Sequence, residues 1–198
     1  MAKRQPTPEN RQVAQHTARA FAAGDNWTVA ERKHNDLPLV IDILSAPESP
    51  GEGLVAYATV GLSDVPMPAP GGGEFPTRLE LVAAGDAEAK AYPALLAAAA
   101  FHIMRSGRLF APGTVLKNYV EDSYADTTVP HLYLTAPFLW EPRLASFRFA
   151  SKLVSWLLAM PISDGELRFL EANGDTKFEA HLERHGIDIY DLGRSSAA

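Results

Sequence analysis

The hydrophobic pattern of the chain begins with a helical period and then changes to the patterns of strands. Residues 9–23 carry apolar side chains about three to four positions apart and are followed by Gly24, which predicts an amphipathic helix. Residues 37–46 and 53–63 are rich in Val and Ile and are separated by the breaker sequence PESPGEG, whereas residues 77–84 alternate between apolar and polar side chains. These three segments are predicted strands.

After the third strand the pattern changes again, first to a helix and then to two strands. Residues 86–107 are rich in strong helix formers, and residues 94–104 are apolar nearly all round, which predicts a helix that is buried between layers. We expect Asp86 to cap this helix and the internal Pro93 to break or kink it. Two apolar segments bounded by proline, residues 129–138 and 149–162, predict two more strands.

Two helices are predicted near the C-terminus. Ser163 and Glu166 have the spacing of a capping box, which places the start of a helix at Ser163. Gly174 ends this helix, because glycine is favoured directly after a helical C-terminus. A further helix is expected over residues 175–184.

The predicted elements follow the order helix, three strands, helix, two strands and two helices, which is typical of an α+β fold. We therefore expect a mixed, mainly antiparallel sheet with helices packed on it, in a single domain over residues 1–198 with an N-terminal helix and arm over residues 1–26. Residues 65–76 hold so many prolines and glycines that they predict a long surface loop without regular structure. Such loops are more often functional or mobile than merely connecting, and Met67 and Phe75 give this one apolar surface for a partner.

Composition narrows the classes of function. With 46% hydrophobic and 21% charged residues the chain has the composition of a folded globular protein. A net charge of -6 argues against a nucleic-acid partner and suits a basic protein surface. The chain has no cysteine, which excludes disulfides and zinc-thiolate sites, and we expect no cofactor and no metal. The N-terminus does not resemble a signal peptide and no apolar run is long enough to span a membrane, so we expect a cytoplasmic protein.

The sequence GLSDV at residues 61–65 matches most of a nucleophile elbow, with Ser63 at the position of the nucleophile. An elbow needs a second glycine and a helix that follows it. Val65 stands at the position of that glycine, and Pro66 and Pro68 follow instead of a helix. The context therefore disfavours a catalytic serine.

The histidines are the remaining candidates for chemistry. His181 and His185 have the i, i+4 spacing of two metal ligands, but no glutamate directly follows His181 as in a zincin, so we favour a solvated helix over a metal site. His102 and His131 lie in apolar segments, where hydrogen-bonded structural histidines are the commoner case. A small hydrolase that uses His102 or His131 with Ser63 remains an alternative function. A regulatory subunit that self-associates through exposed strand edges is another.

Several motifs, taken in their order, resemble the suppressor-of-fused (SUFU) domain family. ATVGLSDVPM is followed by the alternating strand RLELVAA and by the proline-bearing apolar helix AYPALLAAAAFHIMRSGRLF, with PGT after it. The C-terminal half continues with VPHLYLTAPF, with VSWLLAMPISDGELRFLEANG and with a closing DLGRS. The resemblance covers residues 28–195 and rests on the order of the motifs.

The resemblance implies a SUFU-like fold and a protein-binding role without catalysis. Bacterial single-domain members have the role of immunity proteins that neutralise a polymorphic toxin, so the implied partner is a toxin domain. The groove for the partner is then expected beside the loop after the Gly-Leu-Ser-Asp motif, and the implied partner-binding residues are Ser63, Asp64, Pro66, Met67 and Phe75. Pro66 and Met67 replace an aromatic residue of animal members, so the peptide specificity of those members does not carry over. We expect Ser63 and Asp64 to end a strand by hydrogen-bonding their own loop backbone, which would aim the loop.

Overall fold

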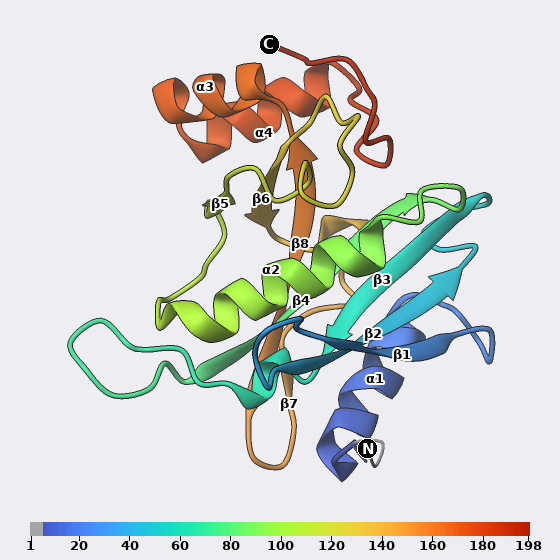
Figure 1. Ribbon diagram of the computed structural model, residues 1–198, viewed down its shortest axis with the longest axis vertical. Helices are drawn as coiled ribbons and strands as arrows, with labels where there is room; N and C mark the ends of the chain where they lie inside the picture. Colours follow the sequence, from blue (N-terminus) through green and yellow to red (C-terminus); the bar gives the residue numbers. More distant parts are fainter. Residues whose placement is uncertain (1–5) are drawn as a thin grey trace.

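The computed structural model describes residues 6–198, in which one mixed sheet runs through both halves of the chain (Figure 1). Residues 1–5 of the predicted N-terminal arm lie outside the described residues. The strands are β1 (Thr28–Lys33), β2 (Val40–Pro47), β3 (Leu54–Val60), β4 (Thr77–Asp86), β5 (Val115–Leu116), β6 (His131–Thr135), β7 (Phe147–Arg148) and β8 (Leu153–Ile162). The helices are α1 (Pro8–Ala20), α2 (Tyr92–Ser106), α3 (Asp164–Asn173) and α4 (Asp175–Arg184), with short 3₁₀ helices η1 (Leu62–Asp64) and η2 (Phe138–Trp140).

The strand order is β1-β2-β3-β4-β8-β6-β5, and β7 pairs with β8 outside this path. Each neighbouring pair is antiparallel except β4 and β8, which run parallel. The predicted α+β class with a mixed, mainly antiparallel sheet is therefore confirmed. In this parallel pair Thr77 lies opposite Leu153, so two distant parts of the sequence meet at the centre of the sheet.

The sheet separates two hydrophobic cores. Helix α2 covers one face, where Leu79 and Leu81 of β4 belong to the buried cluster beneath the helix (Figure 1). Val82 of β4 points to the other face, into a cluster that also holds buried side chains of α1, α3 and α4. Because β4 has a core on both sides, even its acidic residue Glu80 is fully buried, with 0% of its surface exposed.

Three strands were not predicted from the sequence. β1 is an edge strand with exposed side chains along nearly its whole length, so it lacks the apolar alternation that marks a half-buried strand. Its backbone pairs fully with β2, from Thr28 opposite Ser45 to Lys33 opposite Val40. β5 and β7 contain two residues each, which is too short for any periodicity to be read.

Helix α2 differs from its prediction in three ways. It begins at Tyr92, because β4 continues to Asp86, so Asp86 ends a strand and caps no helix. Pro93 lies in the first turn, where its missing N–H has no helical partner to lose, and it causes no break. The helix is not enclosed on all sides, since Ala94 and Arg105 on its outer face are exposed. No helix within residues 6–198 combines the length and apolar character needed to cross a membrane.

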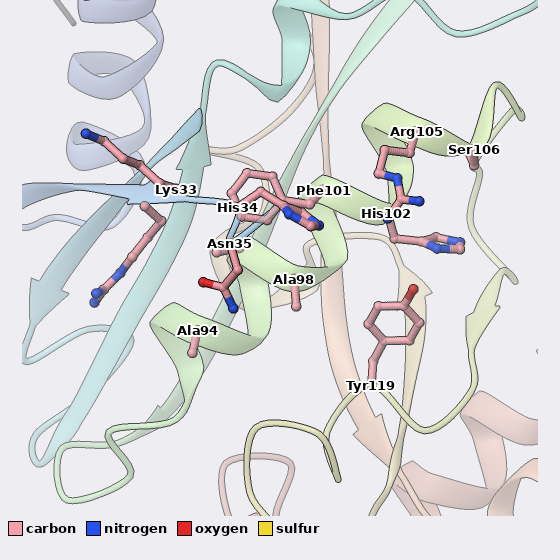
Figure 2. A pocket seen from close by; sticks show the side chains of 12 residues that line it. Lys33, His34, Asn35, Ala94, Ala98, Phe101, His102, Arg105, Ser106 and Tyr119 are labelled. Carbon is pink, nitrogen blue, oxygen red and sulfur yellow. The ribbon is translucent and has the colours of Figure 1, made fainter. Parts of the chain in front are cut away.

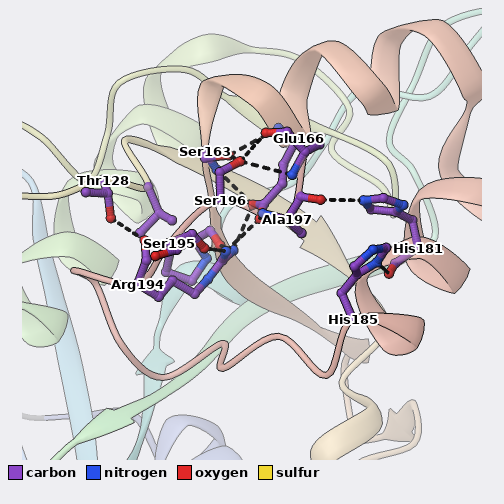
Figure 3. A network of polar contacts seen from close by, with 12 residues as sticks. Thr128, Ser163, Glu166, His181, His185, Arg194, Ser195, Ser196 and Ala197 are labelled. Atoms are coloured by element: carbon purple, nitrogen blue, oxygen red, sulfur yellow. Dashed lines mark hydrogen bonds and ion pairs between the residues drawn. The ribbon is translucent and has the colours of Figure 1, made fainter.

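The C-terminal segment is fastened to the start of α3 by a buried ion pair (Figure 3). The predicted capping box is present: Ser163 Oγ accepts a hydrogen bond from Glu166 N, and Ser163 N donates to Glu166 Oε2. Arg194 donates to both carboxylate oxygens of Glu166, at 2.6 and 2.7 Å. Burial alone would raise the pKa of Glu166, but the hydrogen bonds from Arg194 and from backbone N–H groups outweigh it and lower the pKa.

Candidate partner-binding site

A sharp turn follows β3 and is organised by the side chain of a neighbouring strand. Gly61 has φ of 105°, a left-handed conformation that favours glycine, and η1 begins directly after it. Glu80 Oε1 accepts hydrogen bonds from Gly61 N at 2.9 Å, Ser63 N at 3.1 Å and Ser63 Oγ at 2.7 Å. Glu80 Oε2 accepts from Thr59 Oγ1 at 2.6 Å. The carboxylate of β4 thereby fixes the backbone at the point where the chain leaves β3.

The environment of Glu80 is unusual for a carboxylate. Among the described residues its partners are neutral hydroxyl and backbone N–H groups, and it takes part in no ion pair. Burial raises the pKa of Glu80, and the hydrogen bonds from Thr59, Ser63 and Gly61 offset only part of this effect. A buried polar group of this kind is expensive to leave unpaired, so the network holds the turn in one geometry.

Asp64 ties the same turn to two distant parts of the chain. Its Oδ1 lies 2.6 Å from Lys152 Nζ, just before β8, and its Oδ2 accepts a hydrogen bond from Asn10 Nδ2 of α1 at 2.8 Å. Both partners are nearly buried, with 7% of Lys152 and 1% of Asn10 exposed. The turn after β3 is therefore connected to β4, β8 and α1.

These contacts correct the predicted roles of Ser63 and Asp64. We expected both side chains to bond the backbone of their own loop, but both reach partners far away in the sequence. The backbone forms its own hydrogen bonds in this turn: Asp64 N donates to Gly61 O, and Val65 N donates to Leu62 O. The 3₁₀ turn closes on itself and leaves the side chains available for tertiary contacts.

The segment 65–76 is more regular than its prolines and glycines predict. Phe75 N donates to Met67 O at 2.7 Å, Ala69 N donates to Gly73 O at 3.0 Å, and an antiparallel bridge lies between these pairs. Gly71, Gly72 and Gly73 all have positive φ, which lets the chain reverse at the tip. The segment is thus a small hairpin that projects from the body of the protein between η1 and β4 (Figure 1).

The five predicted partner-binding residues differ in their exposure to solvent. Asp64 and Pro66 are exposed and Phe75 is partly buried. Ser63 and Met67 are buried, with 1% and 6% of their surfaces exposed, so our expectation that Met67 gives the loop apolar surface is wrong. Met67 belongs to the cluster beneath α2, and Phe75 packs against the same cluster. These two side chains hold the base of the hairpin against the core and leave its proline- and glycine-rich tip exposed.

The structure does not bring Ser63 together with either candidate histidine. The Ser63 hydroxyl donates to Glu80, as described above. His131 Nδ1 accepts a hydrogen bond from Asn118 N at 3.1 Å, and His131 Nε2 lies 3.0 Å from Asp164 Oδ1. The ring of His102 stands edge-on to Tyr119, with ring centroids 5.2 Å apart.

His181 and His185 are held by backbone carbonyl groups. A ring N–H of His181 donates to Ala197 O at 2.9 Å, and one of His185 donates to His181 O at 2.8 Å (Figure 3). Within residues 6–198 no group of three His, Asp or Glu side chains is placed to hold a metal ion. The two rings lie 4.2 Å apart between centroids, and the hydrogen bond of His181 joins the C-terminal segment to α4.

Three residues that build the turn were not predicted from the sequence: Asn10, Glu80 and Lys152. Glu80 lies in the predicted strand 77–84, and the sequence pattern assigned it no role. One signal was available: a glutamate flanked by leucines inside an apolar strand must either face solvent or find hydrogen-bond donors. Asn10 and Lys152 carried no comparable signal, because their partner Asp64 is distant in sequence.

A chain with this fold belongs to a known family of proteins. Residues 38–195 match the family model described as Suppressor of fused protein (SUFU), and the chain is a member of this family. It is also 37% identical over 190 residues to Immunity protein YqcF of Bacillus subtilis (strain 168), covering 96% of this chain and 97% of that protein. The family resemblance read from the sequence motifs is therefore confirmed.

Solved structures share the fold at low sequence identity. A putative SUFU homolog from Neisseria gonorrhoeae FA 1090 superposes with a TM-score of 0.66 at 16% identity, covering 96% of each chain. A chain of the Sufu-Fu complex superposes with a TM-score of 0.69 at 15% identity, covering 98% of this chain and 93% of that one. At these identities the similarity establishes the common fold.

Proposed function

We propose that this single-domain chain is an immunity protein that neutralises a toxin by binding it directly, without catalysis of its own. The observation that carries the proposal is the similarity to Immunity protein YqcF, which extends over 96% of the chain at 37% identity. A similarity of this extent includes both halves of the sheet and the hairpin at 65–76. The structure named as the Sufu-Fu complex, in which a chain of this fold occurs, supports a protein as the partner.

We place the contact with the toxin at the exposed part of the hairpin and the adjacent Asp64. Met67 and Phe75 anchor the base of the hairpin, and the Glu80 network fixes its start, so the direction in which the hairpin projects is set before binding. A surface that is ordered before binding loses less conformational entropy when the partner arrives. Binding loops are commonly held by a rigid scaffold in this way.

The two alternative functions have less support. A hydrolase that uses Ser63 would need its hydroxyl open to a substrate, but Ser63 is only 1% exposed. Its hydroxyl donates to the fully buried Glu80 and not to His102 or His131. Self-association through the edge strand β1 is disfavoured by the run Glu31, Arg32 and Lys33, since charged side chains on an edge oppose strand pairing.

The test is a comparison of partner capture by two matched proline variants. Pro66→Asp/Pro70→Asp adds two charges to the exposed hairpin, and Pro47→Asp/Pro112→Asp adds the same charges at exposed prolines outside it. Both variants lose two prolines, so changes in the entropy of the unfolded chain are similar. The tagged proteins are incubated with lysate of the source organism, and the retained proteins are identified by mass spectrometry and then purified for calorimetry.

We expect the wild type and the control variant to retain one stoichiometric partner that is toxic when expressed alone. The hairpin variant should bind it at least about tenfold more weakly, because charges are buried at the interface without partners. If no form of the protein retains such a partner, the immunity function is wrong. If both variants bind as tightly as the wild type, the placement of the site at the hairpin is wrong.

A further inference from the structure

A trough of about 630 Å³ lies on the outer face of α2 (Figure 2), and no residue of the hairpin 65–76 lines it. Its floor is made of small and apolar side chains of the helix, including Ala94, Ala98 and Phe101. Figure 2 shows residues at the end of β1, among them His34, on one side of the helix, and Tyr119 on the other.

The charge of this trough is opposite to that of the chain. The side chains that line it include Arg32, Lys33, His34, His102 and Arg105, and no Asp or Glu is among them. The chain as a whole carries a net charge of -6. Such a local concentration of cationic and imidazole groups favours an anionic ligand at this place on an otherwise acidic protein.

Two of the cationic side chains are available for a ligand. Arg32 and Arg105 are exposed, and neither takes part in an ion pair with another described residue. Lys33 is less available, since its Nζ lies 3.2 Å from Glu31 Oε1. Guanidinium groups bind carboxylates with two parallel hydrogen bonds, so the arginines are suited to an anionic partner.

The His34 ring is arranged as a hydrogen-bond donor toward the trough, and the His102 ring responds to nearby charge. Asp36 N donates to His34 Nδ1 at 3.0 Å, which leaves Nε2 as the N–H of the neutral ring. Burial lowers the pKa of His102, and the positive charges of Arg108 and Arg105 lower it further. An anion bound near His102 would relieve this effect, so its ring is a sensitive reporter of occupancy.

We propose that the trough binds a short acidic segment of the partner protein, with carboxylates on Arg32 and Arg105 and an apolar side chain against Phe101. The inference rests on the proposed function and specifies part of the partner's chemistry. A peptide is favoured over a nucleic acid by two features. The floor is apolar, and the net negative charge of the surrounding protein would repel the phosphates of a strand that extends beyond the trough.

The test uses a defined probe and amide resonances of the full chain. The probe is the peptide acetyl-Asp-Glu-Phe-Glu-Asp-amide, titrated to millimolar concentration into ¹⁵N-labelled protein. Resonances of β1 and α2 should shift, and the signals of the His102 ring should move with them. The variant Arg32→Gln/Arg105→Gln should bind at least about tenfold more weakly, and the control Arg143→Gln/Arg148→Gln, which removes two exposed arginines elsewhere, should bind as the wild type does.

Three results would overturn the inference. One is the absence of shifts in β1 and α2 with the acidic peptide. Another is that inorganic phosphate or oligothymidylate at the same charge concentration produces the same shifts with equal affinity, which would assign the trough to small anions or to nucleic acid. The third is that Arg32→Gln/Arg105→Gln binds the captured toxin as tightly as the wild type; the immunity function would then stand while the role of the trough fails.

Discussion

Replacing Glu80 by leucine removes the acceptor on which the turn after β3 depends. Leucine is no smaller than glutamate, so the change removes hydrogen bonds without opening a cavity. Glu80→Gln is the matched control, because an amide oxygen can still accept the bonds from Gly61 N and Ser63 N. The pair of variants separates the loss of the acceptor from the loss of charge.

The magnitude follows from the groups that leucine would leave unpaired. The Ser63 hydroxyl can rotate to another acceptor, and that of Thr59 has Leu81 O at 3.5 Å. The two backbone N–H groups, of Gly61 and Ser63, cannot move without unfolding the turn. Each buried N–H without an acceptor costs about 1–3 kcal/mol, and relief from burying a carboxylate offsets part of the total. We therefore expect Glu80→Leu to lower the free energy of unfolding by about 2–4 kcal/mol and Glu80→Gln by less than about 1.5 kcal/mol.

The assay is urea unfolding followed by tryptophan fluorescence, together with amide hydrogen exchange of the hairpin 65–76. Faster exchange in the hairpin of Glu80→Leu would show that the turn has lost its anchor. The reasoning is refuted if Glu80→Leu lies within about 0.5 kcal/mol of the wild type, or if Glu80→Gln is as unstable as Glu80→Leu.

The raised pKa of Glu80 predicts that the free energy of unfolding depends on pH. Because burial raises the pKa of Glu80, the folded protein holds this proton at pH values where the unfolded chain has released it. The contribution of Glu80 to the free energy of unfolding therefore falls as pH rises from the ordinary glutamate pKa through the raised value. Glu80→Gln lacks this contribution, so its deficit relative to the wild type should shrink as pH rises from the ordinary glutamate pKa through the raised value. A deficit that stays constant over this range would contradict the raised pKa.

Two further substitutions test the packing around the site. Arg194→Met leaves the buried Glu166 carboxylate without its cation and should cost about 3–5 kcal/mol in urea unfolding. Glu166→Gln/Arg194→Met removes the uncompensated charge and keeps an acceptor for Ser163 N or Ala197 N, so it should recover part of the loss. The pKa of Glu166 is lowered, so the wild type should lose this stability as pH falls through that lowered value, and equal acid sensitivity of Arg194→Met would count against the pair. Gly85→Ala places a Cβ 1.9 Å from Tyr92 Cε2 and should lower the free energy of unfolding by about 1–3 kcal/mol. Gly51→Ala places a Cβ 3.9 Å from its nearest atom and should leave the free energy of unfolding nearly unchanged. Equal effects of the two alanines would refute the steric argument.

The elements predicted well from the sequence are those whose ends are set by nearby residues. The residue ranges of α3 and α4 agree with the prediction, because the capping box of Ser163 and Glu166 and the turn at Gly174 act within one or two turns of the helix. The start of α2 was wrong, because Asp86 remains in β4 through its pairing with Leu54. That pairing is a tertiary contact, and no local pattern reveals it.

The sequence singled out the segment of the candidate site but did not predict how it is built. The Gly-Leu-Ser-Asp motif and the proline- and glycine-rich segment 65–76 were noted, whereas the hairpin form of that segment and the buried state of Ser63 and Met67 were not predicted. Ser63 is buried because Glu80 of the next strand approaches it, and Met67 is buried because the cluster beneath α2 reaches the base of the hairpin. Both causes lie in elements that only the folded chain brings together.

Growth rescue tests the central claim most directly. Cells that express the captured toxin from an inducible promoter are supplied with the wild type, Pro66→Asp/Pro70→Asp or Pro47→Asp/Pro112→Asp at equal protein levels. We predict that the wild type and the control restore growth and that the hairpin variant fails to do so, in proportion to its weaker binding. If the wild type binds the toxin in solution and the cells still die, the protein is a partner of the toxin and not its immunity protein.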